Sequence, residues 1–455
     1  MSPTRDLSGS LLLDGVRLSD VVLAAGTPTY VYDLDGIAGQ ARSLRSALPA
    51  GPSAHLIAYS IKANAAGPIV RALAGEGCGA DVVSGAELRV ALACGINPER
   101  IVYSGVAKQD DELDFAVACG DRGIGAVQIE SVEEIARVEA RARSAGRRVR
   151  IGIRVNPSID LGDATHAHIS TGHDDAKFGV RNVDVPRAVQ LAEGSQWLEL
   201  AGMTTHVGSK LPTVEPYLQA ARILFQTVRG LREAGALRAL SFVNTGGGFS
   251  VDYGGGPVPE PADFARAVVA EQRAQGLSDF ALYVEPGRAL VAPFGVLIAR
   301  VIQPKVTDSA RFLMIDAGMN DLIRPALYQA RHRIVPLEDP PGRDGMGLGS
   351  TLHAGNSRDA PGSAGAPSRR DHWCTWQVVG PVCESSDDFG EHALPREPPA
   401  SVAILDAGAY GFTMASRYNG RQLPAEVFVR GGAMVGKTER ESVETWARER
   451  AMAGT

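Results

Sequence analysis

Four polar features of the chain stand where apolar runs end. Lys62 follows the run "AHLIAYSI", His206 follows "LELAGMTT", three glycines at 246–248 follow "LSFVNT", and Glu285 follows "FALYV". A lysine amine can hold an aldehyde covalently, successive glycines let backbone N–H groups approach an anion, and a buried carboxylate can keep a pyridine nitrogen protonated. Together these features predict a pyridoxal phosphate site. Each also has an ordinary interpretation, namely a solvated lysine, a hydrogen-bonded core histidine, a tight turn and the end of a strand.

The elements that must position these residues follow one pattern. Short apolar runs alternate with stretches of helical period, and the runs read as strands at 54–61, 79–83, 100–105, 123–129, 149–156, 198–208, 240–246 and 280–286. This alternation is typical of parallel βα units, and eight units in about 240 residues fit a (β/α)8 barrel. The helical stretches include 85–95, 131–146 and 214–235.

Polar residues end most of these runs. In a (β/α)8 barrel the carboxyl ends of the strands form one reactive rim. The residues expected on that rim are Lys62, Asp81, Ser104, Glu130, Arg154, Asn156, His206, Ser209, Gly246, Gly247, Gly248, Glu285 and Arg288. The loops after the seventh and eighth strands, where such barrels commonly hold a phosphate, contain the glycines and the segment "EPGR".

After Pro286 the pattern changes to strands separated by turns. The strands are expected at 295–306, 310–320, 373–381, 401–408 and 425–435, and the segment 11–33 also reads as strands that pair with them. The sequence therefore predicts an antiparallel β-sandwich or barrel domain at 291–455 that includes the N-terminal strands of 1–35, with the barrel at 36–290. Within it, 338–372 is rich in Pro, Gly and Ser, which predicts a disordered insertion.

Composition narrows the class of protein. With 46 basic and 52 acidic residues the net charge is −6, and no long basic run occurs, which argues against nucleic acid or an anionic membrane as a partner. The start of the chain lacks the features of a secretory signal, and no apolar run reaches the length of a membrane span, so we expect a cytoplasmic protein.

Neither a disulfide framework nor a metal site is predicted. The five cysteines show no C-x-x-C spacing. The segment 165–175 contains His166, His168 and His173, but their spacing matches no standard zinc pattern. We interpret that segment as a polar loop over the barrel mouth.

The ordered motifs resemble those of one family. They are "YSIKAN", "GADVVSGAEL", "THAHISTGHDDAKFGV", "HVGS", "NTGGGFSVDY", "EPGR", "DAGMNDLIRPALY", "GPVCESSD" and "DAGAYGFTMASRYN". Over almost the whole chain they resemble diaminopimelate decarboxylase, in the alanine-racemase-like fold type of pyridoxal phosphate enzymes. The resemblance implies decarboxylation of meso-2,6-diaminopimelate at its D-centre to L-lysine and CO2. It also implies a homodimer, because the last cysteine segment of the family reaches the active site of a neighbouring subunit.

The resemblance also implies roles for single residues. Lys62 looks like the lysine that holds the cofactor, His206 like the residue that stacks on its ring, and Glu285 like the partner of the ring nitrogen. Ser209 with Gly246, Gly247 and Gly248 resembles the phosphate cradle, and Asp81 and Arg154 are counted with the cofactor-binding residues. Cys383 is similar to the family's proton donor. The residues that resemble substrate-binding ones are Arg288, Arg324, Tyr328, Glu384 and Tyr410, of which Tyr410 also contacts the cofactor.

Three positions depart from the family pattern. Lys210 stands where glutamine is usual, Ala86 where glycine is usual, and Arg417 where asparagine is usual. The alternatives left open are a decarboxylase of ornithine, lysine, arginine or a carrier-linked amino acid, and a non-catalytic protein of the same fold. Arg288 with Glu384 favours a substrate that has a second carboxylate and a second amine. A degenerate regulator would be expected to lack Lys62 or Cys383, and both are present.

Overall fold

The computed structural model describes residues 3–49, 54–159, 177–339 and 372–452. By their internal contacts these residues form two compact units. One contains residues 37–251 and 257–290, and the other contains residues 1–36, 252–256 and 291–455. Each unit is described by itself.

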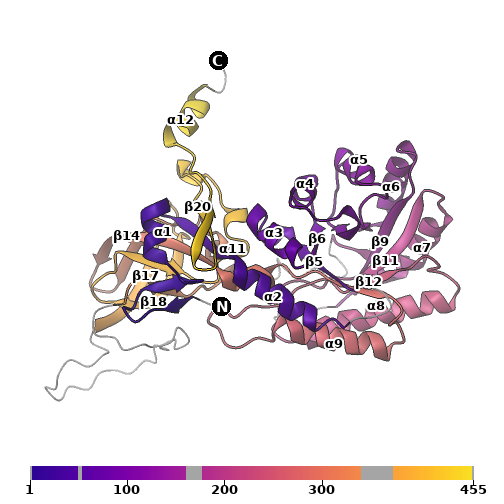
Figure 1. The fold of residues 1–455 in the computed structure, drawn as a ribbon, viewed down its shortest axis with the longest axis horizontal. Coiled ribbons are helices and arrows are strands. Elements are labelled where there is room, and N and C mark those ends of the chain that lie inside the picture. Colours follow the sequence, from indigo (N-terminus) through magenta and orange to yellow (C-terminus); the bar gives the residue numbers. More distant parts are fainter. Residues whose placement is uncertain (1–2, 50–53, 160–176, 340–371, 453–455) are drawn as a thin grey trace. The chain divides into compact units, whose positions relative to one another are not determined.

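The first unit is a closed parallel barrel (Figure 1). Each barrel strand pairs in parallel with the next one along the chain, and β8 pairs with β9 so that the path closes through β13 and β5. The strands are β5 Leu56–Ser60, β6 Gly79–Val82, β7 Ile101–Tyr103, β8 Ala126–Ile129, β9 Val149–Asn156, β11 Leu198–Thr204, β12 Phe242–Asn244 and β13 Ala281–Val284. The predicted (β/α)8 barrel is confirmed, and each predicted strand contains one of these.

Helices lie outside the barrel strands, as Figure 1 shows for α4, α6 and α8. The helices of this unit are α3 Gly67–Gly75, α4 Gly85–Ala93, α5 Asp110–Ala118, α6 Val132–Ser144, α7 Val185–Gly194, α8 Glu215–Glu233, α9 Pro261–Ala274 and α10 Arg288–Val291. Two of them begin at a serine: Ser84 accepts from the backbone N–H of Glu87, and Ser131 from that of Glu134. Such caps satisfy a helix N–H that has no partner within the helix. The strand β10 Val180–Arg181 adds to β9 at the barrel edge.

The second unit is built on a curled sheet into which an N-terminal strand is inserted. The strand β4 Thr29–Asp33 pairs with β14 Gly295–Val306 on one side and with β20 Ala425–Arg430 on the other. The prediction that N-terminal strands join the C-terminal domain is therefore confirmed. The pairings of β4 with β20 and of β15 with β17 are parallel, so the sheet is mixed where the sequence predicts antiparallel pairing. Parallel neighbours here come from distant parts of the chain, which local turn signals do not reveal.

The remaining strands of this unit are short, apart from two. They are β1 Thr4–Arg5, β2 Leu11–Leu13, β3 Val16–Arg17, β15 Arg311–Ile315, β16 Ile334–Pro336, β17 Trp373–Val379, β18 Asp388–Pro395, β19 Ser401–Ile404 and β21 Ala433–Lys437. Its helices are α1 Leu18–Ala25, α11 Arg324–Tyr328 and α12 Val443–Met452, while α2 Leu34–Ser46 runs across the boundary between the two units.

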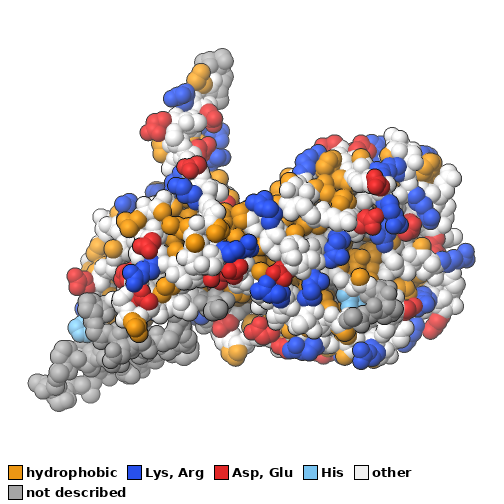
Figure 2. All heavy atoms as spheres, in the orientation of Figure 1, with side chains coloured by type: hydrophobic (Ala, Val, Ile, Leu, Met, Phe, Trp, Pro, Cys, Tyr) orange, Lys and Arg blue, Asp and Glu red, His pale blue; other side chains and the backbone are white. Residues whose placement is uncertain are grey.

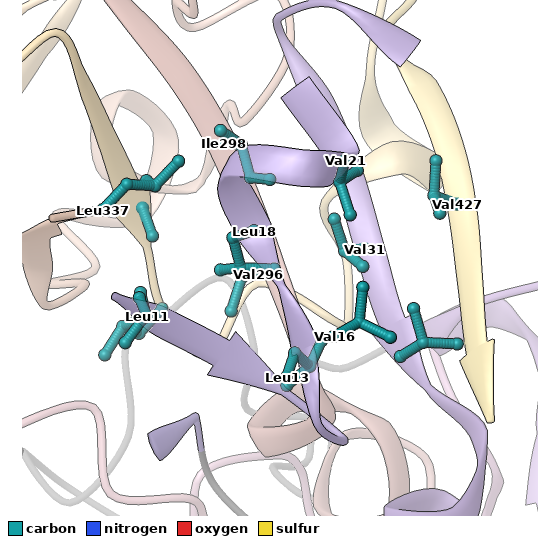
Figure 3. Packing of buried hydrophobic residues seen from close by; sticks show 13 residues of the cluster. Leu11, Leu13, Val16, Leu18, Val21, Val31, Val296, Ile298, Leu337 and Val427 are labelled. Atoms are coloured by element: carbon teal, nitrogen blue, oxygen red, sulfur yellow. The ribbon is translucent and has the colours of Figure 1, made fainter. Parts of the chain in front are cut away.

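One predicted strand segment is a helix. Within 11–33 the stretch Leu18–Ala25 forms α1, which buries Leu18 and Val21. Figure 3 shows these two side chains against Val31 of β4 and Val296 of β14, in a cluster of buried aliphatic residues. A largely apolar segment of eight residues fits a strand or a short helix equally well, and here helical packing on the sheet decides between them.

Two predictions lie outside the described residues. They are the histidine-containing segment 165–175 and all but the ends of the insertion predicted at 338–372. In the described part of the chain, no helix is long and apolar enough to cross a membrane. Figure 2 shows acidic and basic side chains interspersed over the face in view, including on α12.

Candidate active site

Lys62 lies in the turn Ile61–Ala63 that directly follows β5. Its Nζ is 2.8 Å from Oδ2 of Asp81, whose side chain is completely buried, whereas 37% of the Lys62 side chain is exposed. The Oγ of Ser60 lies 2.9 Å from the same carboxylate oxygen. The other oxygen of Asp81, Oδ1, is buried without a hydrogen-bond partner among the described residues. The amine is therefore held at the barrel rim by a buried carboxylate that keeps one oxygen available.

Glu285 follows β13 and is buried. Its Oε1 accepts a hydrogen bond of 2.6 Å from Nδ2 of Asn244, and Oδ1 of Asn244 accepts one of 2.9 Å from the N–H of Gly246. Burial raises the pKa of Glu285, and the nearby Asp81 carboxylate raises it further. A cationic N–H group placed beside this carboxyl would stabilise its charged form.

The glycine triplet packs too closely for side chains. A Cβ on Gly246 would lie 2.6 Å from the carbonyl oxygen of Thr205, one on Gly247 2.1 Å from that of Glu285, and one on Gly248 2.5 Å from that of Gly208. Gly246 and Gly248 also have φ of +71° and +105°, conformations that residues with a Cβ rarely adopt. The chain therefore requires glycine at all three positions because of close contacts, and at Gly246 and Gly248 because of backbone conformation as well.

His206 is joined to this loop. Its Nδ1 accepts a hydrogen bond of 3.1 Å from the N–H of Gly247, which leaves Nε2 as the ring nitrogen that carries a proton. The pKa of His206 lies well below its usual range because the surrounding protein removes water, and because Arg154 and Lys62 add positive charge nearby. The imidazole is therefore neutral at pH 7, as suits a ring that stacks on a flat group.

Two arginines of the barrel unit lie among these residues. Nη1 of Arg154 lies 3.0 and 3.2 Å from the two carboxylate oxygens of Glu130, and both side chains are almost completely buried. Arg288, which is also buried, donates from Nη2 to Oγ of Ser209 at 3.0 Å. These contacts thus pair Lys62 with Asp81, Arg154 with Glu130, and Arg288 with Ser209.

The other predicted site residues belong to the second unit. Arg324 begins α11 and is almost completely buried, and Tyr328 ends the same helix. Nη1 of Arg324 lies 2.8 Å from Nε2 of His332. Tyr410 has a φ of +55°, so its backbone adopts a left-handed conformation that is uncommon for a tyrosine.

Cys383 and Glu384 follow β17 in a loop of the second unit. Cys383 is exposed, and its backbone N–H donates to Oδ1 of Asn419 at 3.0 Å. The hydroxyl of Tyr418 donates to the carboxylate of Glu384. The buried carboxylate of Asp387 accepts from the backbone N–H of Val382 at 2.6 Å. The loop that carries the thiol is thus fixed at several backbone positions, while the thiol itself remains accessible.

The barrel residues fit pyridoxal phosphate. A partly exposed lysine amine can take the aldehyde, a loop of three successive glycines is of the type that binds an anion through backbone N–H groups, and the buried Glu285 carboxyl suits a ring N–H. The buried Oδ1 of Asp81 has no hydrogen-bond partner among the described residues, so a polar group bound beside it could supply one.

Comparison with known proteins shows the family to which the chain belongs. Residues 34–292 match the family model for the pyridoxal-binding domain of pyridoxal-dependent decarboxylases. The diaminopimelate decarboxylase of Zymomonas mobilis is 36% identical over 452 residues, which is 99% of this chain and 98% of that protein. The chain belongs to the diaminopimelate decarboxylase family. The resemblance seen in the motifs is therefore confirmed, and so is pyridoxal phosphate as the cofactor of the family.

Solved structures of the family agree with the fold. A diaminopimelate decarboxylase of Helicobacter pylori complexed with L-lysine matches with a TM-score of 0.81 and 33% identity, and the match covers 96% of this chain and 100% of that one. The diaminopimelate decarboxylase of M. jannaschii in complex with L-lysine matches with a TM-score of 0.85 and 29% identity, over 98% and 97% of the two chains. The family's barrel and sheet domain thus extend over nearly the whole chain.

Several residues that contact the predicted site residues were absent from the sequence prediction, among them Ser60, Asn244 and Asn419. Ser60 contacts Asp81, Asn244 contacts Glu285, and Asn419 accepts a hydrogen bond from the backbone N–H of Cys383. Asn244 ends an apolar strand directly before the loop of the glycine triplet, so its position carried a signal. The position of Asn419 carried no such signal, because this residue contacts Cys383, which lies 36 positions away in the sequence.

Proposed function

We propose that this chain decarboxylates meso-2,6-diaminopimelate at its D-centre and releases L-lysine and CO2, with pyridoxal phosphate as cofactor. The observation that carries the proposal is the exposed amine of Lys62 paired with the buried Asp81 at the rim of a barrel whose family is decarboxylases. The relatives named for this reaction, two of them solved with L-lysine, favour diaminopimelate over ornithine, arginine or a carrier-linked substrate.

On the barrel side, the residues bind and orient. Lys62 would hold the cofactor aldehyde, and the backbone of Gly246 to Gly248 with Ser209 would hold its phosphate. Neutral His206 offers a flat face to the cofactor ring without adding charge. Glu285 would pair with the ring N–H, which keeps that nitrogen protonated. When bound, pyridoxal phosphate supplies an electron sink for the bond to the departing carboxylate.

The substrate carries two carboxylates and two ammonium groups. Arg288 and Arg324 are the proposed carboxylate partners, because a guanidinium can bind a carboxylate through two parallel hydrogen bonds. Glu384 is the proposed partner of the distant ammonium group, and Tyr328 and Tyr410 are proposed to add hydroxyl contacts. Selectivity for the meso isomer follows if these groups accept only one of its two ends.

Cys383 is the proposed proton donor to the carbon that has lost its carboxylate. Its exposed thiol on a loop fixed by Asn419 and Asp387 supports this role. A general acid of this kind contributes about 10²- to 10⁴-fold to the rate. Because the thiol must stay reduced, the proposal includes a cytoplasmic location. It also includes a homodimer in which Cys383 serves the partner's site.

The test is product analysis by mass spectrometry. The purified chain with pyridoxal phosphate is mixed separately with meso-diaminopimelate, its L,L isomer, ornithine, lysine and arginine. Lysine formed from the meso isomer alone is the expected result. A diamine from one of the other amino acids would move the function to a related decarboxylase, and no product in any mixture would refute decarboxylation of free amino acids.

A further inference from the structure

His332 of the second unit makes two hydrogen bonds through its two ring nitrogens. Nδ1 lies 2.8 Å from the carbonyl oxygen of Leu405, and Nε2 lies 2.8 Å from Nη1 of Arg324. The imidazole is almost completely buried, and so is the arginine. These contacts connect a buried backbone carbonyl to a residue proposed to bind a substrate carboxylate.

The two partners determine the state of the ring. A carbonyl oxygen only accepts, so Nδ1 must carry a hydrogen, and a guanidinium only donates, so Nε2 must present its lone pair. The imidazole of His332 is therefore neutral with its proton on Nδ1. In this state the ring accepts a hydrogen bond from Arg324 and donates one to the backbone carbonyl of Leu405.

A neutral acceptor orients an arginine without cancelling its charge. The ring of Tyr253 adds to this, because its centre lies 4.6 Å from the guanidinium carbon of Arg324 and its edge packs on His332. The nearby carboxylate of Asp406 is bound by another arginine, Arg333, at 2.7 and 3.1 Å. The carboxylate of Asp406 is thus bound by Arg333, whereas the Arg324 guanidinium contacts the neutral ring of His332.

We infer that His332 is a positioning residue, which fixes the Arg324 guanidinium for the substrate carboxylate while leaving its charge intact. The inference rests on the proposed function, in which Arg324 binds that carboxylate. Because the carboxylate is bound in both the ground state and the transition state, loss of the positioning contact should act mainly on KM.

Two substitutions separate the two ring contacts. The amide of glutamine in His332→Gln reaches the position of Nε2 and can accept from Arg324, whereas that of asparagine in His332→Asn reaches the position of Nδ1 and serves Leu405 only. We expect His332→Asn to raise KM for meso-diaminopimelate on the order of tenfold, the effect of one lost hydrogen bond to a charged group, with kcat little changed. His332→Gln should stay close to wild type.

The matched control is His392→Gln. His392 is a histidine of β18 whose Nε2 lies 3.0 Å from the carbonyl oxygen of Phe389, so its loss tests the general cost of removing a histidine from this unit. We expect the control to leave KM unchanged. Thermal unfolding and cofactor absorbance of every variant report folding separately from substrate binding.

A second experiment places His332→Asn in an Arg324→Lys background. If the histidine acts through the arginine, its own effect on KM should shrink to less than about twofold there. An equal rise of KM in both backgrounds would overturn the inference, as would equal effects of the Asn and Gln variants or a normal KM in His332→Asn. Absence of turnover by the wild-type chain would refute the proposed function instead.

Discussion

Gly247→Ala is the substitution whose effect follows most directly from the structure. The added Cβ would lie 2.1 Å from the carbonyl oxygen of Glu285, and ordinary van der Waals contact begins at 3.4 Å, so the loop or the strand end must move by about 1.3 Å. The same carbonyl lies 3.1 Å from Oγ of Ser60, which also contacts Asp81, the partner of Lys62. The displacement therefore affects both the phosphate loop and the lysine.

Two magnitudes follow. Overpacking of this kind destabilises a fold by about 1–3 kcal/mol. Loss of one hydrogen bond from the loop to a phosphate would cost about 1.5–3 kcal/mol, which weakens cofactor binding roughly 10- to 150-fold. The assay is a titration of the cofactor-free chain with pyridoxal phosphate followed by absorbance, together with thermal unfolding of the cofactor-free chain.

The matched control is Gly230→Ala. This glycine lies inside α8, and a Cβ there would meet nothing within 4 Å. Alanine favours a helix by about 0.5–1 kcal/mol over glycine, so the same substitution should raise the unfolding temperature and leave cofactor affinity unchanged. If Gly247→Ala keeps the cofactor affinity and the unfolding temperature of the wild type, the loop accommodates the added Cβ without loss of stability, and the predicted effect is wrong.

Four further predictions concern Lys62, Cys383 and Glu426. Lys62→Ala should abolish turnover and the visible absorbance of the bound cofactor, because it removes the amine and leaves the buried Asp81 without its cation; a purified variant that keeps both signals would remove Lys62 from the mechanism. Cys383→Ala should keep the cofactor absorbance but lose about 10²- to 10⁴-fold in kcat. If Cys383 serves the partner's site, reassociated mixtures of these two variants should recover about a quarter of the wild-type activity, whereas no recovery would place both residues in one subunit's site. Burial raises the pKa of Glu426 to about 7, so the folded chain keeps a proton there that the unfolded chain loses above the usual pKa of 4.5, and stability falls as the pH rises from about 4.5 to about 7. Glutamine does not titrate, so Glu426→Gln should not lose this stability. The free energy of unfolding of the variant, relative to that of the wild type, should therefore rise by about 2–3 kcal/mol from pH 4.5 to pH 8; parallel pH profiles of the two proteins would contradict this.

The barrel was predictable from the sequence because of the burial of its strands. Strands covered on both faces read as mostly apolar runs, so β5, β9 and β11 were visible as segments of the right length. The polar residues near the carboxyl ends of β5 and β6 then placed Lys62 and Asp81 on one rim, since neighbouring strands in this barrel are also neighbours in sequence.

The second unit was harder to predict. The segment that forms α1 mixes Ser19 and Asp20 with apolar residues over only eight positions, and β18 contains charged residues and a histidine, so neither segment showed the apolar pattern typical of its element. The parallel pairing of β4 with β20 joins segments almost 400 residues apart, for which local sequence has no sign. The contact of His332 with Arg324 was hidden in another way, because it depends on which ring nitrogen faces which partner.

The position of β4 has a consequence for synthesis of the chain. This strand leaves the ribosome before the barrel does, yet its two neighbours, β14 and β20, begin at Gly295 and Ala425, after the whole barrel has been made. At roughly 5–20 residues per second, an apolar strand with both edges open waits tens of seconds for its first partner. The barrel can close during that interval, because its strands pair in chain order. Substitutions that lower the apolar character of β4 would therefore act on nascent-chain aggregation and chaperone demand as well as on the stability of the finished sheet.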